Sequence, residues 1–360
     1  RQMCIRDSAL SYLELVKEGR EDDPIDLHAD YLGFNAYVSQ YSKMADVIYM
    51  LQYVIGDSLF DFAIKNYFKE WHFKHPYRED MIASFEKTAN RDLDWFFDQW
   101  LETTWQLDYA VDDIEGMWQV TDGIKTYHAE ITLKNLNKIF MPIDLDITLK
   151  NGRQVLYHIP VDGSAKKETG REVLPYWHFS KKEYNTTVKL EDAIDLVEID
   201  ASQRLMDINR LNNRSGLLPE MEFVFMRPQS NAPPLESYLW EGWPLIFYND
   251  KDKAKVGFKL EGSYLAMDHL MDLGVWYKTA TGNLDYDLNY KHPFNWLGNN
   301  SYAGIRTYTL DGVQGSELSL DKQIIKNRYR DPVYTLSLNL RNYNRFDNEY
   351  ALSVWSRGTV

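Results

Sequence analysis

The first side chain of chemical interest is a tyrosine just before a helix. In the segment "AYVSQYSKMADVIYMLQYVIG" (residues 36–56), apolar residues recur at helical spacing from Met44 onward, and Gly56 supplies a stop signal. Tyr41 lies before this apolar stripe, whose packing does not require a phenol. Two interpretations are open: Tyr41 is an ordinary half-buried helix-entry residue, or its hydroxyl faces a reaction.

The histidines do not form a recognisable metal motif. None of the eight begins an H-E-x-x-H pair, which would place two imidazoles one helical turn apart on zinc. His72 and His75 in "WHFKHP" are three residues apart, but Pro76 follows directly and no carboxylate lies between them. The sequence therefore favours a structural interpretation of this pair over a metal site.

Other common catalytic motifs are absent from the sequence. It holds no G-x-S-x-G elbow, no P-loop and no G-x-G-x-x-G. Paired acids such as Asp22–Asp23 and Asp112–Asp113 are most simply solvated loop charges. Composition and spacing alone thus give no complete active site.

Length and charge limit the classes of protein to consider. The 360 residues are enough for two or three domains, each with its own core. A net charge of −14 argues against nucleic acid as a partner, because phosphate binding needs a basic face. The single cysteine, Cys4, excludes a disulfide framework within the chain and a cysteine metal site. No apolar run reaches the ~18 residues of a transmembrane helix.

Both ends of the sequence look cut. The opening "RQMCIRDS" resembles a translated sequencing adaptor, so we expect residues 1–8 to be an artefact. The last residues, "SVWSRGTV", stop within an alternating pattern without a closing turn. We therefore expect the chain to be an internal piece of a longer protein.

Residues 9–105 are predicted to be helical. Leu59, Phe62, Ala63 and Tyr67 form one apolar stripe behind Asp57 or Ser58 as N-cap. A further helix starts after Pro76. In "RDLDWFFDQWLETT", a third stripe follows Asp92 as N-cap. Such stripes must pack on each other or on other parts of the protein.

At about residue 106 the hydrophobic period changes from 3.6 to 2. Short alternating segments separated by Gly, Asp and Asn turns predict a β-sandwich over residues 106–213. Residues 214–240 are irregular and Pro-rich, and we interpret them as a linker.

Residues 241–360 show a stronger two-residue alternation. Leu284, Tyr286, Leu288 and Tyr290 alternate with polar residues, as do the apolar positions of 256–260 and 334–340. Strands of this kind are typical of an outer-membrane β-barrel, here truncated, with lipid on one face. The alternative is a soluble antiparallel sheet with one wet face. Aromatic residues near strand ends, as in "FNWLGNNSY", favour the barrel.

The helical part resembles a known family. "YSKMADVIYMLQYVIGDSLFDFAIKNYFKEWHFKHPYREDMIASFEKTANRDLDWFFDQWLETT" is similar to the C-terminal half of the catalytic domain of aminopeptidase-N-like zinc metallopeptidases, the gluzincins. The resemblance covers about residues 22–112 and rests on a Y-x-K-G pattern, an IG turn, an HP…D stretch and a "dLdwff…W" helix. "VEIDASQRLMDINRLNN" resembles the β-domain that follows in that family. "GFKLEGSYL" resembles a surface-antigen-like barrel extension.

The resemblance assigns a role to Tyr41, which matches the tyrosine of Y-x-K-G. In the family this hydroxyl donates to the oxyanion that forms when zinc-bound water attacks the scissile carbonyl. Two histidines and a glutamate hold the zinc there, and these ligands are expected upstream of this chain. The sequence departs from the pattern at Met44, where glycine is usual, and at Ser42, where glutamate or valine is usual.

The resemblance and the patterns together predict a multidomain protein, α then β. They imply a thermolysin-like helical half-domain, a β-sandwich and a partial antiparallel β-barrel in the outer membrane and periplasm of a bacterial cell envelope. The implied function is a zinc-dependent aminopeptidase acting on peptides, inactive as this fragment. The alternative is a non-catalytic assembly or binding protein with a degenerate peptidase-like domain.

Overall fold

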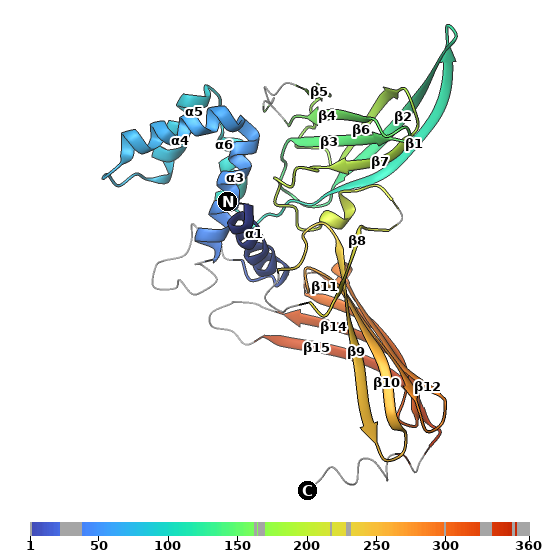
Figure 1. Cartoon of the computed structure of the whole chain (residues 1–360). Helices are drawn as coiled ribbons and strands as arrows, with labels where there is room; N and C mark the ends of the chain where they lie inside the picture. Colours follow the sequence, from blue (N-terminus) through green and yellow to red (C-terminus); the bar gives the residue numbers. More distant parts are fainter. Residues whose placement is uncertain are drawn as a thin grey trace. The chain divides into compact units, whose positions relative to one another are not determined.

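Figure 1 presents a computed structural model of the chain, which describes residues 2–21, 38–161, 164, 170–216, 218–227, 232–298, 300–324, 333–347 and 350. The chain divides into two compact units. Unit 1 comprises residues 1–13 and 21–219, and unit 2 comprises residues 14–20 and 220–360.

The helices come first along the chain and are blue in Figure 1. A five-residue π-helix, η2, runs directly into α3. Two short 3₁₀ turns, η3 and η4, occur later. The bounds are α1 Gln2–Lys17, η2 Ser39–Lys43, α3 Met44–Ile55, α4 Asp57–Trp71, α5 Arg78–Ala89, α6 Asp94–Leu101, η3 Arg210–Asn212 and η4 Asn295–Leu297.

The predicted helix after Tyr41 is confirmed in type and in both bounds. α3 begins at Met44, and Val47, Leu51, Val54 and Ile55 of its apolar stripe are buried. Gly56 ends it with a φ of 89°, a conformation that favours glycine because it has no Cβ. α4 follows at Asp57, so the turn between these two helices is a single residue.

α4 and α5 pack through aromatic side chains. Phe85 of α5 is completely buried, and its ring lies 6.1 Å from each of the rings of Phe60 and Tyr67 on α4. These two residues are seven apart and so share one face of α4. Phe62 lies on another face of the same helix and is 58% exposed.

Two β-sheets complete unit 1. One has the strand order β1-β2-β6 and the other β5-β4-β3-β7. Alternate residues of β2 and β3, including Ile131, Leu133, Leu145 and Ile147, are fully buried. The β-sandwich stays a prediction. The bounds are β1 Tyr109–Thr121, β2 Ile124–Asn135, β3 Ile143–Leu149, β4 Gln154–Ile159, β5 Glu172–Val173, β6 Glu183–Leu190 and β7 Ile194–Ile199.

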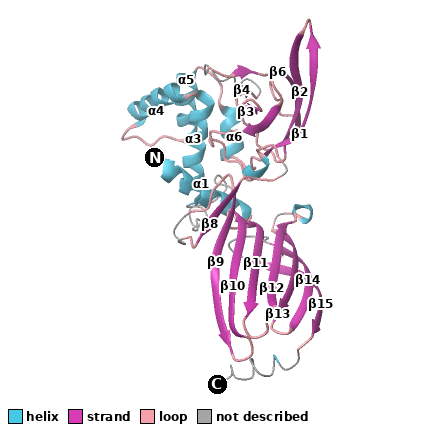
Figure 2. Cartoon of the chain, turned by 45° about the vertical axis from the view of Figure 1, so that its right-hand side comes forward, coloured by secondary structure: helices cyan, strands magenta, loops and turns pink. Residues whose placement is uncertain are grey.

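Unit 2 contains one eight-stranded sheet, visible in magenta in Figure 2, in the order β15-β14-β13-β12-β11-β10-β9-β8. All neighbours are antiparallel except β8 and β9. The sheet is open, so the described strands form no closed barrel. The bounds are β8 Met221–Phe225, β9 Tyr238–Asn249, β10 Lys253–Tyr264, β11 Asp268–Lys278, β12 Leu284–Pro293, β13 Ser301–Leu310, β14 Val313–Ile324 and β15 Tyr334–Arg345.

The two faces of this sheet differ in chemistry. One face carries apolar and aromatic side chains that are exposed although they are large: Ile246, Val256, Phe258, Val275, Tyr277, Leu284, Tyr286, Ile305, Leu318 and Leu338. Strand registers place these residues side by side, as in the pairs Val256–Tyr277 and Ile305–Leu318. The opposite face carries ion pairs such as Arg306–Asp287, in which the N···O distance is 2.7 Å.

Some boundaries differ from the sequence-based ones. The range taken as a linker, 214–240, contains β8 and the start of β9, because short apolar strands were hidden among prolines. Residues 14–20 group with unit 2, and residues 2–8 continue α1. The artefact assignment of residues 1–8 stays a prediction.

Among the described residues, no helix combines the length and apolarity needed to span a membrane.

The packing of α4 on α5 predicts a stability effect. Phe85→Ala should lower the free energy of unfolding of unit 1 by about 3–5 kcal/mol, because a fully buried ring leaves a cavity. Phe62→Ala, on the exposed face of α4, should change it by less than about 0.5 kcal/mol. Urea unfolding followed by circular dichroism measures both, and equal effects of the two substitutions would contradict this packing.

Candidate functional site

Tyr41 lies in the middle of the π-helix η2. Its side chain is 62% exposed, and its carbonyl oxygen accepts a hydrogen bond from the backbone N–H of Met44. Short π-helical segments are rare, and those that occur are frequently at functional sites. The structure thus presents the phenol at an exposed irregularity immediately before a regular, buried helix.

Lys43 anchors this turn from the opposite side. Residues two apart on a helix do not share a face, so an exposed Tyr41 goes with an inward Lys43, which is only 1% exposed. The Lys43 ammonium lies 2.6 Å from Oε1 of Glu21 and donates to the carbonyl oxygen of Thr103 at 3.2 Å. The Tyr12 hydroxyl donates to the same Glu21 oxygen at 3.2 Å. Burial, followed by the charge of Glu21, raises the pKa of Tyr12 well above its usual value.

A second ionisable residue, Asp46, is buried one turn further along α3. It is 2% exposed, and neither carboxyl oxygen has a hydrogen-bond partner in the described part of the chain. Burial raises the pKa of Asp46 to about 8, so the group is mostly protonated and neutral at pH 7. Neither Lys43 nor Asp46 is predicted from the sequence. The available signal was the spacing of Ser39, Lys43 and Asp46, which puts three polar residues on the inward face.

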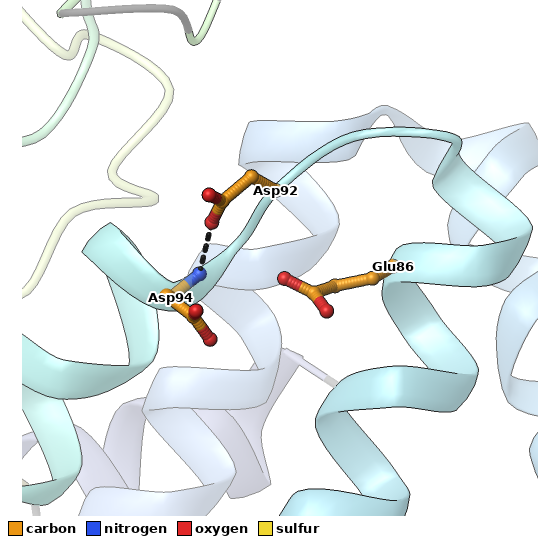
Figure 3. A group of neighbouring side chains, drawn as sticks. All are labelled: Glu86, Asp92 and Asp94. Atoms are coloured by element: carbon orange, nitrogen blue, oxygen red, sulfur yellow. Dashed lines mark hydrogen bonds between the residues drawn. The ribbon is translucent and has the colours of Figure 1, made fainter.

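Three carboxylates gather at the start of α6, as shown in Figure 3. Asp92 accepts a hydrogen bond from the backbone N–H of Asp94, and Glu86 of α5 accepts one from the N–H of Leu93, both at 2.8 Å. These oxygens satisfy donors that the helix start would otherwise leave open. The predicted N-cap is wrong by one residue: the N-cap of α6 is Leu93, and Asp92, which precedes it, accepts the hydrogen bond from Asp94. Hydrogen bonds to the start of α6 thus engage two of the three carboxylates, those of Glu86 and Asp92.

A second group of three carboxylates lies in unit 2. Lys255 places its ammonium 2.7 Å from an oxygen of Asp285 and 2.7 Å from one of Asp311. The Tyr350 hydroxyl lies 2.7 Å from Asp252, the third carboxylate. Lysine and tyrosine thus already occupy the space between these acids.

His72 contacts residues of the preceding helix, and the structural role of the His72 and His75 pair stays a prediction. The ring of His72 stacks on Phe68, with 5.7 Å between centroids, and Nδ1 lies 3.0 Å from the carbonyl oxygen of Lys69. Neither histidine belongs to a group of three His, Cys, Asp or Glu ligands among the described residues.

Comparisons with known proteins place part of unit 1 in a family context. Residues 32–100, which include Tyr41 and α3–α6 up to Trp100, match the model of the Peptidase family M1 domain. Among solved structures, aminopeptidase A of Legionella pneumophila in complex with aspartic acid matches at 17% identity and a TM-score of 0.32. The match covers 47% of this chain and 18% of that one, so the chain spans less than a fifth of its length. No curated protein matches. The matched segment is therefore similar to part of an M1-like peptidase domain.

The buried Asp46 predicts a pH dependence of stability. Its folded pKa of about 8 lies above the usual 3.8, so between pH ~4 and ~8 the unfolded state binds fewer protons than the folded state. The free energy of unfolding should therefore fall as pH rises through this window, by up to about 1.4 kcal/mol per pH unit.

Asp46→Asn should remove this component, whereas Asp61→Asn, at an exposed position of α4, should keep it. Urea unfolding at pH 5, 6, 7 and 8 compares the slopes. Equal slopes for Asp46→Asn and the unsubstituted chain would refute the assignment.

Proposed function

We propose that the chain is part of a zinc-dependent aminopeptidase that hydrolyses N-terminal peptide bonds, with Tyr41 as the oxyanion donor. One observation carries the proposal. The exposed phenol of Tyr41 lies on the π-helix η2, which the buried Lys43 holds in place, inside the segment that matches the Peptidase family M1 domain. The family match supports a peptidase-like function, and the specific reaction is our inference.

The described residues do not fit the family's zinc donor set of two histidines and a glutamate. Both candidate groups of three ligands consist of carboxylates alone, and hydrogen bonds or lysines engage them. We therefore assign the proposed zinc ligands, together with the general base, to sequence upstream of this chain. Zinc would supply the polarisation of water and carbonyl there.

Tyr41 contributes the chemistry that this chain holds. A neutral phenol donates its proton in a hydrogen bond without transferring it, and that bond strengthens as negative charge develops on the carbonyl oxygen. The donor must also be held in place, since a preorganised dipole costs no reorganisation during the reaction. The buried contacts of Lys43 with Glu21 and Thr103 supply that support from the far side of the turn.

The test is Tyr41→Phe in a longer protein that includes the upstream zinc half. We expect kcat to fall by about 10²–10³-fold, the usual loss for one oxyanion donor. Because the Tyr41 side chain is mostly exposed, removing its hydroxyl should leave stability and zinc content unchanged. Hydrolysis of aminoacyl-p-nitroanilides measures kcat.

The 360-residue chain alone should be inactive in the same assay with added zinc. Zinc-dependent hydrolysis by this chain, or an unchanged kcat in Tyr41→Phe, would contradict the proposal. An upstream motif that lacks its histidines or glutamate would instead favour the non-catalytic assembly or binding protein.

We further propose that unit 2 contacts the lipid of a bacterial outer membrane, with the peptidase part in the cell envelope. The support is the continuous apolar face of its sheet, on which large side chains such as Phe258 and Leu338 are exposed while the other face carries ion pairs. In water, folding favours an arrangement in which such large apolar side chains are buried, because leaving apolar area exposed is costly. A hydrocarbon environment removes that cost.

Vesicle flotation of the full chain tests this proposal. The chain should float with phosphatidylethanolamine–phosphatidylglycerol vesicles. Leu338→Arg, on the apolar face of β15, should reduce the bound fraction, since arginine facing lipid costs about 2–4 kcal/mol at mid-depth. Asn339→Arg, on the opposite face of the same strand, is the matched control and should float normally. A chain that stays in the buffer fraction would favour a soluble sheet.

A further inference from the structure

Two histidines and a tyrosine meet at one end of the sheet of unit 2. His269 lies near the start of β11, and Tyr290 and His292 lie near the end of β12. These strands are antiparallel neighbours, and Leu270 pairs with Lys291, which brings the flanking histidines together. Their ring centroids are 5.0 Å apart. Neither the Tyr41 site nor the proposed peptidase function involves this cluster.

Three potential ligand atoms converge in it. Nδ1 of His269 lies 2.9 Å from the Tyr290 hydroxyl oxygen, and Nδ1 of His292 lies 3.3 Å from the same oxygen. In a tetrahedral zinc site with bonds of about 2.0–2.1 Å, ligand atoms lie about 3.3 Å apart. The separations in this cluster are therefore close to those that a bound ion requires, and only small side-chain shifts are needed.

The protonation of the cluster also allows an ion to enter. A neutral imidazole has one N–H and one lone pair, and the phenol has one proton, so Tyr290 can donate to one histidine while it accepts from the other. A metal ion replaces these protons by accepting the lone pairs of both nitrogens and of the oxygen. The displaced phenol proton goes to solvent, and no oxidant or reductant is needed.

The backbone holds His269 in position. Its φ is +53°, a left-handed conformation that is uncommon for residues other than glycine but that histidine, like asparagine and aspartate, adopts more often than most. The Tyr238 hydroxyl donates to the carbonyl oxygen of His269 at 2.6 Å, which fixes the strand at this point. The neighbouring carboxylate, Asp268, forms an ion pair with Lys17 of the same unit and so is already engaged. Strained residues that the surroundings hold in place occur preferentially at functional sites.

We propose that His269, His292 and Tyr290 form a binding site for a divalent transition-metal ion, with zinc as the probe. Two imidazoles and a phenol oxygen suit Zn²⁺, Cu²⁺ or Ni²⁺ rather than Mg²⁺ or Ca²⁺, which prefer carboxylate and carbonyl oxygens. Three protein ligands leave a fourth tetrahedral position for solvent. The two carboxylate clusters in the described part of the chain lack this combination of donors.

The experiment is isothermal titration of the full chain with ZnCl₂, repeated with MgCl₂. We expect one zinc ion per chain and no magnesium binding at the same concentrations. His269→Ala and His292→Ala should each weaken zinc binding at least about tenfold, since even residues that only support a ligand cost about 10–100-fold. Tyr290→Phe should keep weaker binding but abolish the release of one proton, which titrations in buffers of different ionisation enthalpy detect.

The double substitution His72→Ala/His75→Ala is the matched control, because it removes the other closely spaced histidine pair, and it should leave the affinity unchanged. His292 is exposed, so its substitution should not prevent folding. Zinc binding that survives both His269→Ala and His292→Ala would overturn the proposal, as would the absence of binding up to millimolar zinc. The outcome is independent of the peptidase activity, since the proposed zinc ligands of the peptidase lie upstream of this chain.

Discussion

The buried ion pair between Lys43 and Glu21 is the interaction on which the candidate site depends. An ammonium group leaves water only if a carboxylate and further hydrogen-bond acceptors replace its hydration, and Glu21 and Thr103 provide both. Removing one partner of such a pair typically costs about 3–5 kcal/mol, because the other charge stays buried. The Lys43 ammonium therefore ties the segment that carries Tyr41 to Glu21 and, through its hydrogen bond to Thr103, to the end of α6. The exposure of the phenol follows from the burial of the lysine two residues later.

Unit 1 accommodates the buried Asp46 by protonation, whereas it accommodates the buried Lys43 by an ion pair. Without a cation within hydrogen-bond distance among the described residues, this carboxyl keeps its proton, as its pKa of about 8 indicates. Lys43 and Asp46 lie one turn apart, yet one is neutralised by a partner and the other by protonation. Both arrangements leave the inward face of η2 and α3 without an unpaired charge near neutral pH. This allows a partly polar helix face to pack at the centre of unit 1.

Sequence patterns predicted those parts of the fold that depend on local periodicity. The bounds of α3 and the change to strands near residue 106 follow from apolar spacing and from the stop signal at Gly56. β8 was missed because a five-residue strand among prolines has no clear period. The partners of Lys43 were also beyond prediction, since Glu21 and Thr103 are 22 and 60 residues away along the chain. Tyr41 itself was found by resemblance to a family, and its role remains a proposal.

In the sheet of unit 2, the two-residue period of the strands puts charged side chains on one face and apolar side chains on the other. Because successive side chains point to opposite faces, an ion-paired face and an apolar face coexist on the same strands. A one-residue shift in register would move every side chain to the wrong face, so the ion pairs across strands also protect the register. Arg306 pairs with Asp287 on the neighbouring strand, and Lys255 joins Asp285 to Asp311. The same register places His269 beside His292, so the proposed metal site depends on the pairing that keeps the apolar face continuous.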